Sequence, residues 1–173
     1  MPKLLTTLTL SLMLILSPNA GAKDYVQLLD SFDLERYLGK WYEIARYDHS
    51  FERGLVGVTA TYLMNDDGTI RVENRGYKGT LMGKQKLAVG KAKLAESKLP
   101  GMLKVSFFLW FYSDYNILYL DPEYEYALIG SSTPKYFWIL SRTPTINKET
   151  KDDLLRKARA LGYSTDELIW VPQ

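Results

Sequence analysis

Residues 39–48 read GKWYEIARYD, and this stretch indicates where the fold begins. After the glycine, charged and apolar residues alternate with few turn-forming residues, which is typical of a β-strand. We therefore predict a strand over residues 41–47. Alternate residues of a strand share one face, so Trp41, Glu43 and Tyr47 are expected to point the same way, into the interior. A buried carboxylate must be paired or protonated, and we expect Glu43 to make a structural hydrogen bond rather than to act in catalysis.

Short segments with the same character follow along the chain and are separated by turn signals. The sequence NDDG at residues 65–68 and the pair Pro100-Gly101 predict two hairpin turns. Further strands are predicted at residues 56–62, 69–73, 84–95, 102–107, 115–120, 126–130 and 136–141. Eight antiparallel strands close most economically as an all-β, up-and-down barrel, whose interior is filled by side chains or holds one small ligand.

The pattern changes from a strand period to a helical period after Pro144. Four apolar residues share one face of the predicted helix: Leu154, Leu155, Ala158 and Leu161. Gly162 follows where a helix is expected to end. We predict a C-terminal amphipathic helix packed on the outside of the barrel, and then a short edge strand at residues 168–171.

Several predicted strands are apolar on one alternate face, which predicts the inner wall of the barrel. The residues of that face are Val58, Ala60, Tyr62, Ile70, Val72, Ala88, Gly90, Ala92, Leu94, Leu103, Val105 and Phe107. Ala88, Gly90 and Ala92 are too small to fill the centre of a barrel, which favours a cavity. The alternative is that these small residues mark close packing within the sheet.

Length and composition limit the number of domains and the classes of function that the chain can have. A chain of 173 residues with 46% hydrophobic residues suits one domain with a sizeable core. The 22 Lys and Arg residues nearly cancel the 20 Asp and Glu residues, with no long basic run, which argues against a nucleic-acid partner. The chain contains no cysteine, which excludes disulfides, thiolate catalysis and thiolate metal ligands.

The N-terminus has the layout of a secretory signal. Lys3 precedes an apolar run over residues 8–16, and a proline and small residues follow. We predict a signal peptide over residues 1–22 and one domain over residues 23–173, which is periplasmic or secreted after cleavage. The apolar run is too short to span a bilayer comfortably. The alternative is a retained amphipathic anchor.

Three motifs together resemble the lipocalin family. Gly39-Lys40-Trp41 resembles the family's G-x-W signature at the start of the first strand. Asp121, in the sequence LDPEY, is similar to the T-D-Y turn between strands six and seven, and Arg142 matches the arginine that ends strand eight. The blocks RYLGKWYEIARYDHSFERG, LKVSFF, WILSRTPTI and IWVPQ occur in the order expected of the bacterial and apolipoprotein D-like branch of the family.

The resemblance implies roles for these residues. In the family the tryptophan plugs the closed end of the barrel and the arginine lies across its ring, so Gly39, Trp41, Asp121 and Arg142 form a structural signature. Residues 32–38 are expected to form a single-turn helix over that end. Members of this branch are usually lipid carriers, and the bacterial ones are commonly outer-membrane lipoproteins. This sequence has no lipobox cysteine, so we expect it to be periplasmic or secreted rather than anchored.

Residues with catalytic or metal-binding potential are few. The single histidine, His49, lies between Asp48 and Ser50, but neighbours on an extended chain point to opposite faces and cannot form a triad. One histidine without cysteine leaves only carboxylates as metal ligands, and none has a calcium-loop spacing. We predict no catalytic residue, no cofactor and no metal site.

The sequence VSFFLWFY at residues 105–112 is apolar on both faces, where strand five should turn into strand six. In an up-and-down barrel this turn lies at the same end as the loop over residues 48–54, and together they form the mouth. Exposed apolar residues there could touch a membrane, guide an acyl chain or meet a protein partner. The alternative is that they pack over the rim. The predicted mouth contacts are Phe108, Leu109, Trp110 and Phe111.

These observations together predict a carrier of a single-chain lipid, a fatty acid or lysophospholipid, with the acyl chain in the barrel and the head group near the mouth. The predicted ligand-binding residues are Tyr47, Ala60, Tyr62, Val72, Ala88, Gly90, Ala92, Val105, Phe107, Tyr115 and Trp138. The sequence leaves open two further partners, a membrane surface contacted peripherally and a second copy of the chain in a homodimer. Two alternatives remain: a barrel with a filled core that docks a protein or a second copy, and a lipocalin-fold enzyme.

Overall fold

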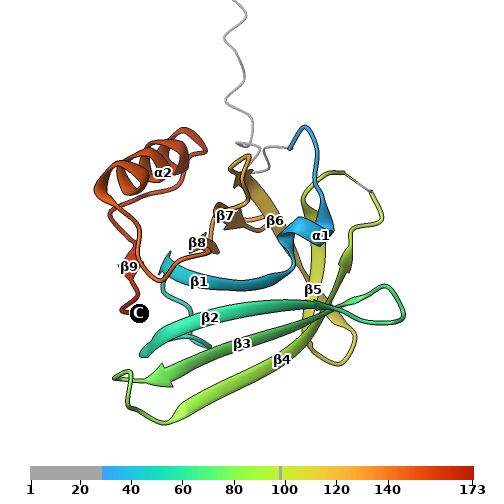
Figure 1. Cartoon of the computed structure of the whole chain (residues 1–173), viewed down its shortest axis with the longest axis horizontal. Helices are drawn as coiled ribbons and strands as arrows, with labels where there is room; N and C mark the ends of the chain where they lie inside the picture. The colour runs from blue at the N-terminus through green and yellow to red at the C-terminus, as the bar shows by residue number, and fades with distance from the viewer. Residues whose placement is uncertain (1–28, 98) are drawn as a thin grey trace, which may run out of the picture.

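The computed structural model describes residues 29–97 and 99–173, and Figure 1 shows the strands wrapped around a common interior. The strands are β1 Gly39–Arg46, β2 Leu55–Met64, β3 Ile70–Lys78, β4 Gln85–Leu94, β5 Met102–Phe108, β6 Phe111–Leu120, β7 Tyr126–Gly130, β8 Phe137–Ser141 and β9 Ile169–Trp170. The helices are α1 Leu34–Tyr37 and α2 Lys148–Ala160. The predicted signal peptide lies outside the described residues.

Strands β1 to β8 form a closed antiparallel barrel. Each strand pairs with the next one along the chain, and β1 pairs with both β2 and β8, which closes the sheet. The short strand β9 pairs with the last two residues of β1. The eight-stranded up-and-down barrel predicted from the sequence is confirmed.

Two strands extend further than their apolar pattern predicts. Strand β3 continues to Lys78 because it pairs with β2 and β4 on its two sides. Strand β6 begins at Phe111 because its pairing with β5 continues as far as the two-residue turn that joins the two strands. Both extensions lie toward the mouth of the barrel. Backbone pairing rather than a buried apolar face supports them, so alternation in the sequence does not mark them.

A β-bulge in β1 reverses which side chains face inward. Glu43 and Ala45 pair with consecutive residues of β8, so Ile44 is an extra residue. One extra residue moves every following side chain to the opposite face of a strand. Arg46 is therefore buried beside Glu43 inside the barrel, whereas Ala45 and Tyr47 pack outside it in the cluster beneath α2. The expectation that Tyr47 lines the interior does not hold for this reason.

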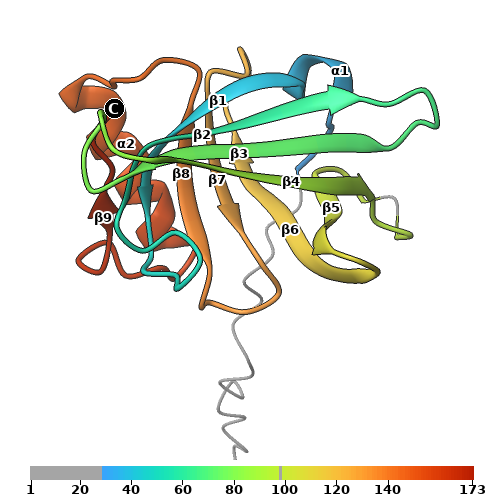
Figure 2. The same ribbon diagram turned by 90° about the horizontal axis from the view of Figure 1, so that it is seen from below.

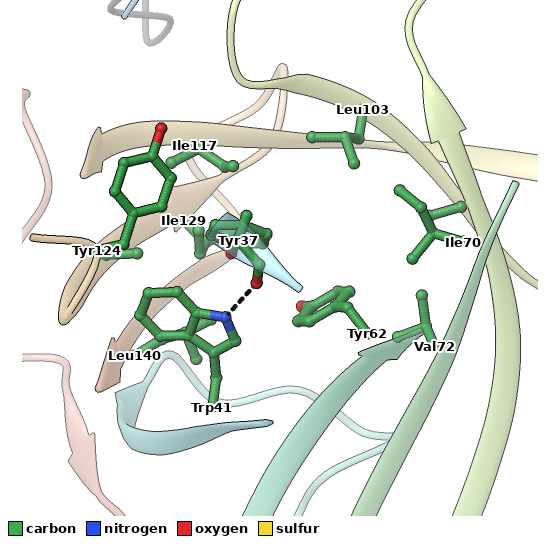
Figure 3. Packing of buried hydrophobic residues seen from close by; sticks show 12 residues of the cluster. Tyr37, Trp41, Tyr62, Ile70, Val72, Leu103, Ile117, Tyr124, Ile129 and Leu140 are labelled. Atoms are coloured by element: carbon green, nitrogen blue, oxygen red, sulfur yellow. Dashed lines mark hydrogen bonds between the residues drawn. The ribbon is translucent and has the colours of Figure 1, made fainter. Parts of the chain in front are cut away.

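Trp41 closes one end of the barrel beneath α1. Its indole Nε1 donates a hydrogen bond of 2.9 Å to the carbonyl oxygen of Tyr37, the last residue of α1 (Figure 3). The Arg142 guanidinium lies 3.9 Å from the centre of the Trp41 ring. Asp33 caps the start of α1 by accepting two backbone N–H groups. The plug, its arginine and the single-turn helix stand where the family resemblance implied them.

Asp121 organises the turn between β6 and β7. Its carboxylate accepts backbone N–H groups from Glu123, Glu125 and Tyr126. The turn is tied to the plug, because the carbonyl oxygen of Tyr124 accepts a hydrogen bond from Arg142 Nε at 3.2 Å. Asp121 therefore acts in the fold, as its resemblance to the family motif implies.

Helix α2 packs outside the barrel, and Figure 2 shows it beside β9 on the side away from α1. Its buried residues Leu154 and Ala158 belong to the same cluster as Ala45 and Tyr47. Gly162 follows the end of the helix with a φ of 89°, a backbone conformation that favours glycine. Among the described residues, no helix combines the length and apolar character needed to cross a membrane.

Candidate ligand-binding site

A cavity of about 1040 Å³ opens at the end of the barrel opposite the Trp41 plug. Because the strands alternate in direction, the β1–β2, β3–β4, β5–β6 and β7–β8 connections all lie at that end. Phe51 and Ser132, from two of these connections, and Phe108, the last residue of β5, are among the lining residues. The cavity is therefore closed at the plug and open at the loops, as a single-entry binding site requires.

Most of the predicted wall residues line this cavity. They are Ala60, Tyr62, Val72, Ala88, Ala92, Val105, Phe107, Tyr115 and Trp138. Ala92 is buried deep in the barrel, and Ala88 lies nearer the mouth on the same strand. Their short side chains leave open space along the β4 wall, which is the effect predicted from the sequence.

Gly90 has a different role from the one predicted for it. A Cβ atom at this position would lie 2.6 Å from the carbonyl oxygen of Ser106 and 2.7 Å from the ring of Phe107. The missing side chain therefore allows the Phe107 ring to pack directly on β4. Gly90 fits the alternative of close packing within the sheet, and it is not among the lining residues.

Three hydrogen-bonded tyrosines surround the inner end of the cavity, above Trp41. The hydroxyl of Tyr115 lies 2.6 Å from that of Tyr37 and 2.7 Å from that of Tyr62. Burial is the largest cause that raises the pKa of all three phenols, so they stay neutral at physiological pH. Tyr62 and Tyr115 line the cavity and give its inner end a polar group in an apolar wall.

A buried ionic cluster forms one side of the cavity. Arg46 donates a hydrogen bond of 2.6 Å to Glu43 and another of 2.9 Å to the backbone carbonyl of Glu52. The Glu52 carboxylate accepts a hydrogen bond from Trp138 Nε1 at 3.0 Å. Burial raises the pKa of both carboxyl groups, and the pKa of Glu43 lies well above its usual value despite Arg46. Glu43 and Glu52 both line the cavity, so they are polar groups within reach of a ligand.

Sequence reasoning found Glu43 in this cluster but missed Arg46 and Glu52. Alternation placed Arg46 on the outer face, because the bulge that turns it inward has no signature in the sequence. Glu52 lies in the β1–β2 loop, where no periodicity applies. Neither residue had a signal that the pattern of the chain could have supplied.

His49 is a packing residue of the mouth. It is 3% exposed, its ring stacks on Phe51 and lies 4.6 Å from the ring of Trp138. Burial and the nearby Arg46 lower its pKa to about 4, so the ring is neutral at physiological pH. The neighbouring Asp48 is bound to Arg53 instead. Within the described residues, no group of three or more His, Asp or Glu side chains is placed to hold a metal ion.

The predicted mouth contacts lie at the turn of the β5–β6 hairpin. Phe108, Leu109, Trp110 and Phe111 are all exposed, so they do not fold over the rim. The rings of Phe108 and Phe111 stack on each other with centres 6.4 Å apart. Phe108 and Phe111 also reach the cavity lining, which connects this apolar hairpin with the entrance.

Comparison with known proteins agrees with this geometry. Residues 32–173 match the family model described as a lipocalin-like domain. The chain belongs to the lipocalin family. Membership implies a binding site for a small hydrophobic ligand, and lipocalins are typically binding proteins rather than enzymes.

Individual lipocalins place the chain in the branch that its sequence blocks suggested. It is 48% identical to the outer membrane lipoprotein Blc of Escherichia coli K12 over 148 residues, which cover 86% of this chain and 83% of that protein. It is 37% identical to apolipoprotein D of Rattus norvegicus over 131 residues, covering 70% and 66% respectively. Insecticyanin from the tobacco hornworm Manduca sexta superposes with a TM-score of 0.70 at 20% identity, covering 86% and 84%, which shows the shared fold.

Proposed function

We propose that this lipocalin binds and carries, or stores, a single-chain lipid of the fatty acid or lysophospholipid class in the cell envelope. The observation that carries the proposal is the cavity of about 1040 Å³, which is apolar along its walls and open at one end. Ligand sites of this kind range over roughly 300–1,000 Å³ and use a few placed polar groups in an apolar wall. A filled core does not fit a cavity of this size.

The distribution of polar groups supports an orientation for the ligand. The inner half of the cavity is lined by side chains such as Val72, Ala92 and Leu103, which suit an acyl chain. Glu43 and Glu52 lie on the β1 side, and Ser131, Ser132 and Thr133 lie at the β7–β8 loop. The head group would then lie toward the loops, where hydroxyl and carboxyl groups are available for hydrogen bonding.

Filling the cavity tests the proposal directly. Ala92→Trp places an indole in the inner part of the cavity, where it cannot share space with an acyl chain. Excluding three methylenes at about 0.8 kcal/mol each lowers affinity for a fluorescent fatty acid by more than about tenfold. Ala88→Trp does the same nearer the mouth, at a position where folding is less demanding. Val89→Trp is the matched control, because Val89 is exposed on the same strand and is not a lining residue.

The outcomes of that titration are distinct. Loss of binding in both cavity variants, with normal thermal unfolding and normal binding in Val89→Trp, supports an acyl chain in this cavity. Unchanged affinity in both folded variants moves the ligand elsewhere. Failure of the unmodified protein to bind any long-chain fatty acid or lysophospholipid rejects the carrier proposal and favours a protein-docking barrel.

The cellular location is part of the same proposal. Several relatives are named outer membrane lipoproteins, whereas this sequence contains no cysteine. We expect cleavage of residues 1–22, so that the exported protein begins near Lys23 in the periplasm or outside the cell. Intact-mass analysis of exported protein measures this, and a retained apolar run over residues 8–16 would contradict it.

A further inference from the structure

The turn of the β5–β6 hairpin exposes two large apolar side chains at the mouth. Leu109 and Trp110 form this two-residue turn and are 64% and 74% exposed. Figure 2 shows the hairpin at the lower right edge of the molecule. Three further apolar residues, Phe51, Leu81 and Met82, are exposed on the β1–β2 and β3–β4 loops, which lie at the same end of the barrel. The mouth therefore presents an apolar rim that contributes little to the core.

The hairpin is held in a strained backbone conformation that keeps Leu109 at its turn. Leu109 has a φ of 51°, in the left-handed region that glycine or asparagine normally occupies. The Ser106 hydroxyl lies 3.3 Å and 3.2 Å from the carbonyl oxygens of Phe108 and Leu109, and it stabilises the turn. Strained backbone clusters at functional sites, so a strained residue is a reason to look for a function at that point.

Charge is distributed unequally between the two ends of the barrel. At the mouth, Lys78, Lys84, Lys86 and Lys135 are exposed, and none forms an ion pair within the described part of the chain. Of the acidic residues there, Asp48 is bound to Arg53 and Glu52 is buried, whereas Glu167 is exposed and lies beside Asp48 and Lys135. The four lysines still outnumber these three acidic residues.

The opposite end, around α1 and the turns beside the Trp41 plug, is rich in carboxylates. The acidic residues of those segments are Asp30, Asp33, Glu35, Asp66, Asp67, Glu96, Asp121, Glu123 and Glu125. The basic residues Arg36, Lys40, Lys91 and Arg142 lie at the same end, and Lys91 is paired with Asp67, so carboxylates remain in excess there. Such an asymmetry orients a molecule in an electric field, with the lysine-bearing mouth toward a negatively charged surface.

We propose that the mouth docks on an anionic lipid bilayer, with Leu109 and Trp110 inserted at the level of the head groups. Tryptophan and leucine favour that interface, and lysines beside an inserted segment attract anionic lipids. Lysine can also keep its aliphatic stem on the apolar surface while its ammonium group reaches a phosphate. A second copy of the chain is a poorer occupant, because a mouth-to-mouth contact would bring the same unpaired lysines together.

Docking in this orientation places the cavity entrance against the membrane. Phe108 and Phe111, beside the inserted turn, also line the cavity. A single-chain lipid could then pass between bilayer and barrel without exposing its acyl chain to water. Docking itself does not depend on what the cavity holds, so it can be tested separately from the proposed function.

Co-sedimentation with large unilamellar vesicles tests the docking surface. The probes are vesicles of phosphatidylcholine alone and vesicles that also contain phosphatidylglycerol. The unmodified protein should bind the anionic vesicles, and Leu109→Ser combined with Trp110→Ser should weaken this binding by about tenfold or more. The control is Leu63→Ser combined with Met64→Ser, because both residues are 44% exposed near the opposite end of the barrel.

Two further measurements identify the contact. Brominated phospholipids should quench Trp110 fluorescence, and the Trp110→Phe variant should bind vesicles while losing that part of the quenching. Lys84→Glu combined with Lys135→Glu should weaken binding to anionic vesicles with little effect on phosphatidylcholine vesicles.

Several results would overturn the proposal. Equal vesicle binding by the turn variant and the unmodified protein would overturn it. An equal loss of binding in the turn variant and in the control variant at Leu63 and Met64 would also overturn it. A dimer in sedimentation equilibrium without lipid, converted to monomer by the turn variant, would assign the surface to a second copy. The turn variant should keep its affinity for a fluorescent fatty acid in solution, which separates failure of docking from failure of ligand carriage.

Discussion

Glu43 and Arg46 form an ion pair of 2.6 Å inside the barrel although they are three residues apart on one strand. Regular alternation would put them on opposite faces, and the bulge at Ile44 brings them to the same side. The pair is almost completely buried and shares its surroundings with the Glu52 carboxyl group. The Arg46 cation favours the charged form of both buried carboxyl groups, through its ion pair with Glu43 and through its charge near Glu52. Arg46 is therefore the central residue of the cluster.

Replacement of Arg46 by methionine is expected to destabilise the protein by about 3–5 kcal/mol, the range for breaking a buried ion pair by removing one partner. Addition of Glu43→Gln should recover part of this loss, because it removes the carboxyl group left without its cation. Chemical denaturation of the two single variants and the double variant measures the coupling. Simple additivity of the two losses would show that the ion pair does not contribute.

His49 should make stability fall at acidic pH. Its pKa is about 4 in the folded protein and about 6.5 in an unfolded chain, so the unfolded state takes up a proton first as the pH drops. Stability is thus lost progressively between about pH 6.5 and pH 4, by roughly 1–3 kcal/mol. His49→Phe preserves the aromatic packing and should lack this loss, so the stability difference between variant and unmodified protein should change across this window. A difference independent of pH would contradict the assignment.

Trp41→Ala should destabilise the fold by roughly 3–5 kcal/mol, as expected for the loss of a buried aromatic side chain. The contact with Arg142 should account for a coupling of about 0.5–2 kcal/mol in a double-mutant cycle with Arg142→Ala. Thermal or denaturant unfolding of the four proteins provides the measurement. A coupling of zero would mean that Arg142 acts only through its hydrogen bonds to backbone carbonyl groups.

Leu109→Gly should stabilise the protein and weaken membrane docking at the same time. Glycine relieves the left-handed strain at a φ of 51°, with an expected gain of roughly 0.5–1 kcal/mol after its larger unfolded-state entropy is counted. The same change removes an apolar side chain from the turn. Denaturation and vesicle co-sedimentation on one preparation test both effects. Lower stability would show that Leu109 makes packing contacts that outweigh its backbone strain.

Much of the site followed from residue pattern. The alternation of Ala60 with Tyr62, and of Ala88 with Ala92, placed these side chains on the cavity wall where the structure has them. Gly90 stands on the predicted face, but only the packing of Phe107 shows that its role is close contact within the sheet.

The Trp41 plug was implied by the resemblance to the lipocalin family, whereas the pattern of the sequence by itself determined the strand order, the barrel closure and the outer helix. These features depend on local signals, such as turns and apolar periodicity, which act over a few residues. The orientation of Tyr47, the inward turn of Arg46 and the burial of Glu52 were decided only by tertiary structure. Each depends on hydrogen bonding and packing with residues distant in the chain, because a bulge forms where β1 meets β8 and a loop is placed by what it packs against.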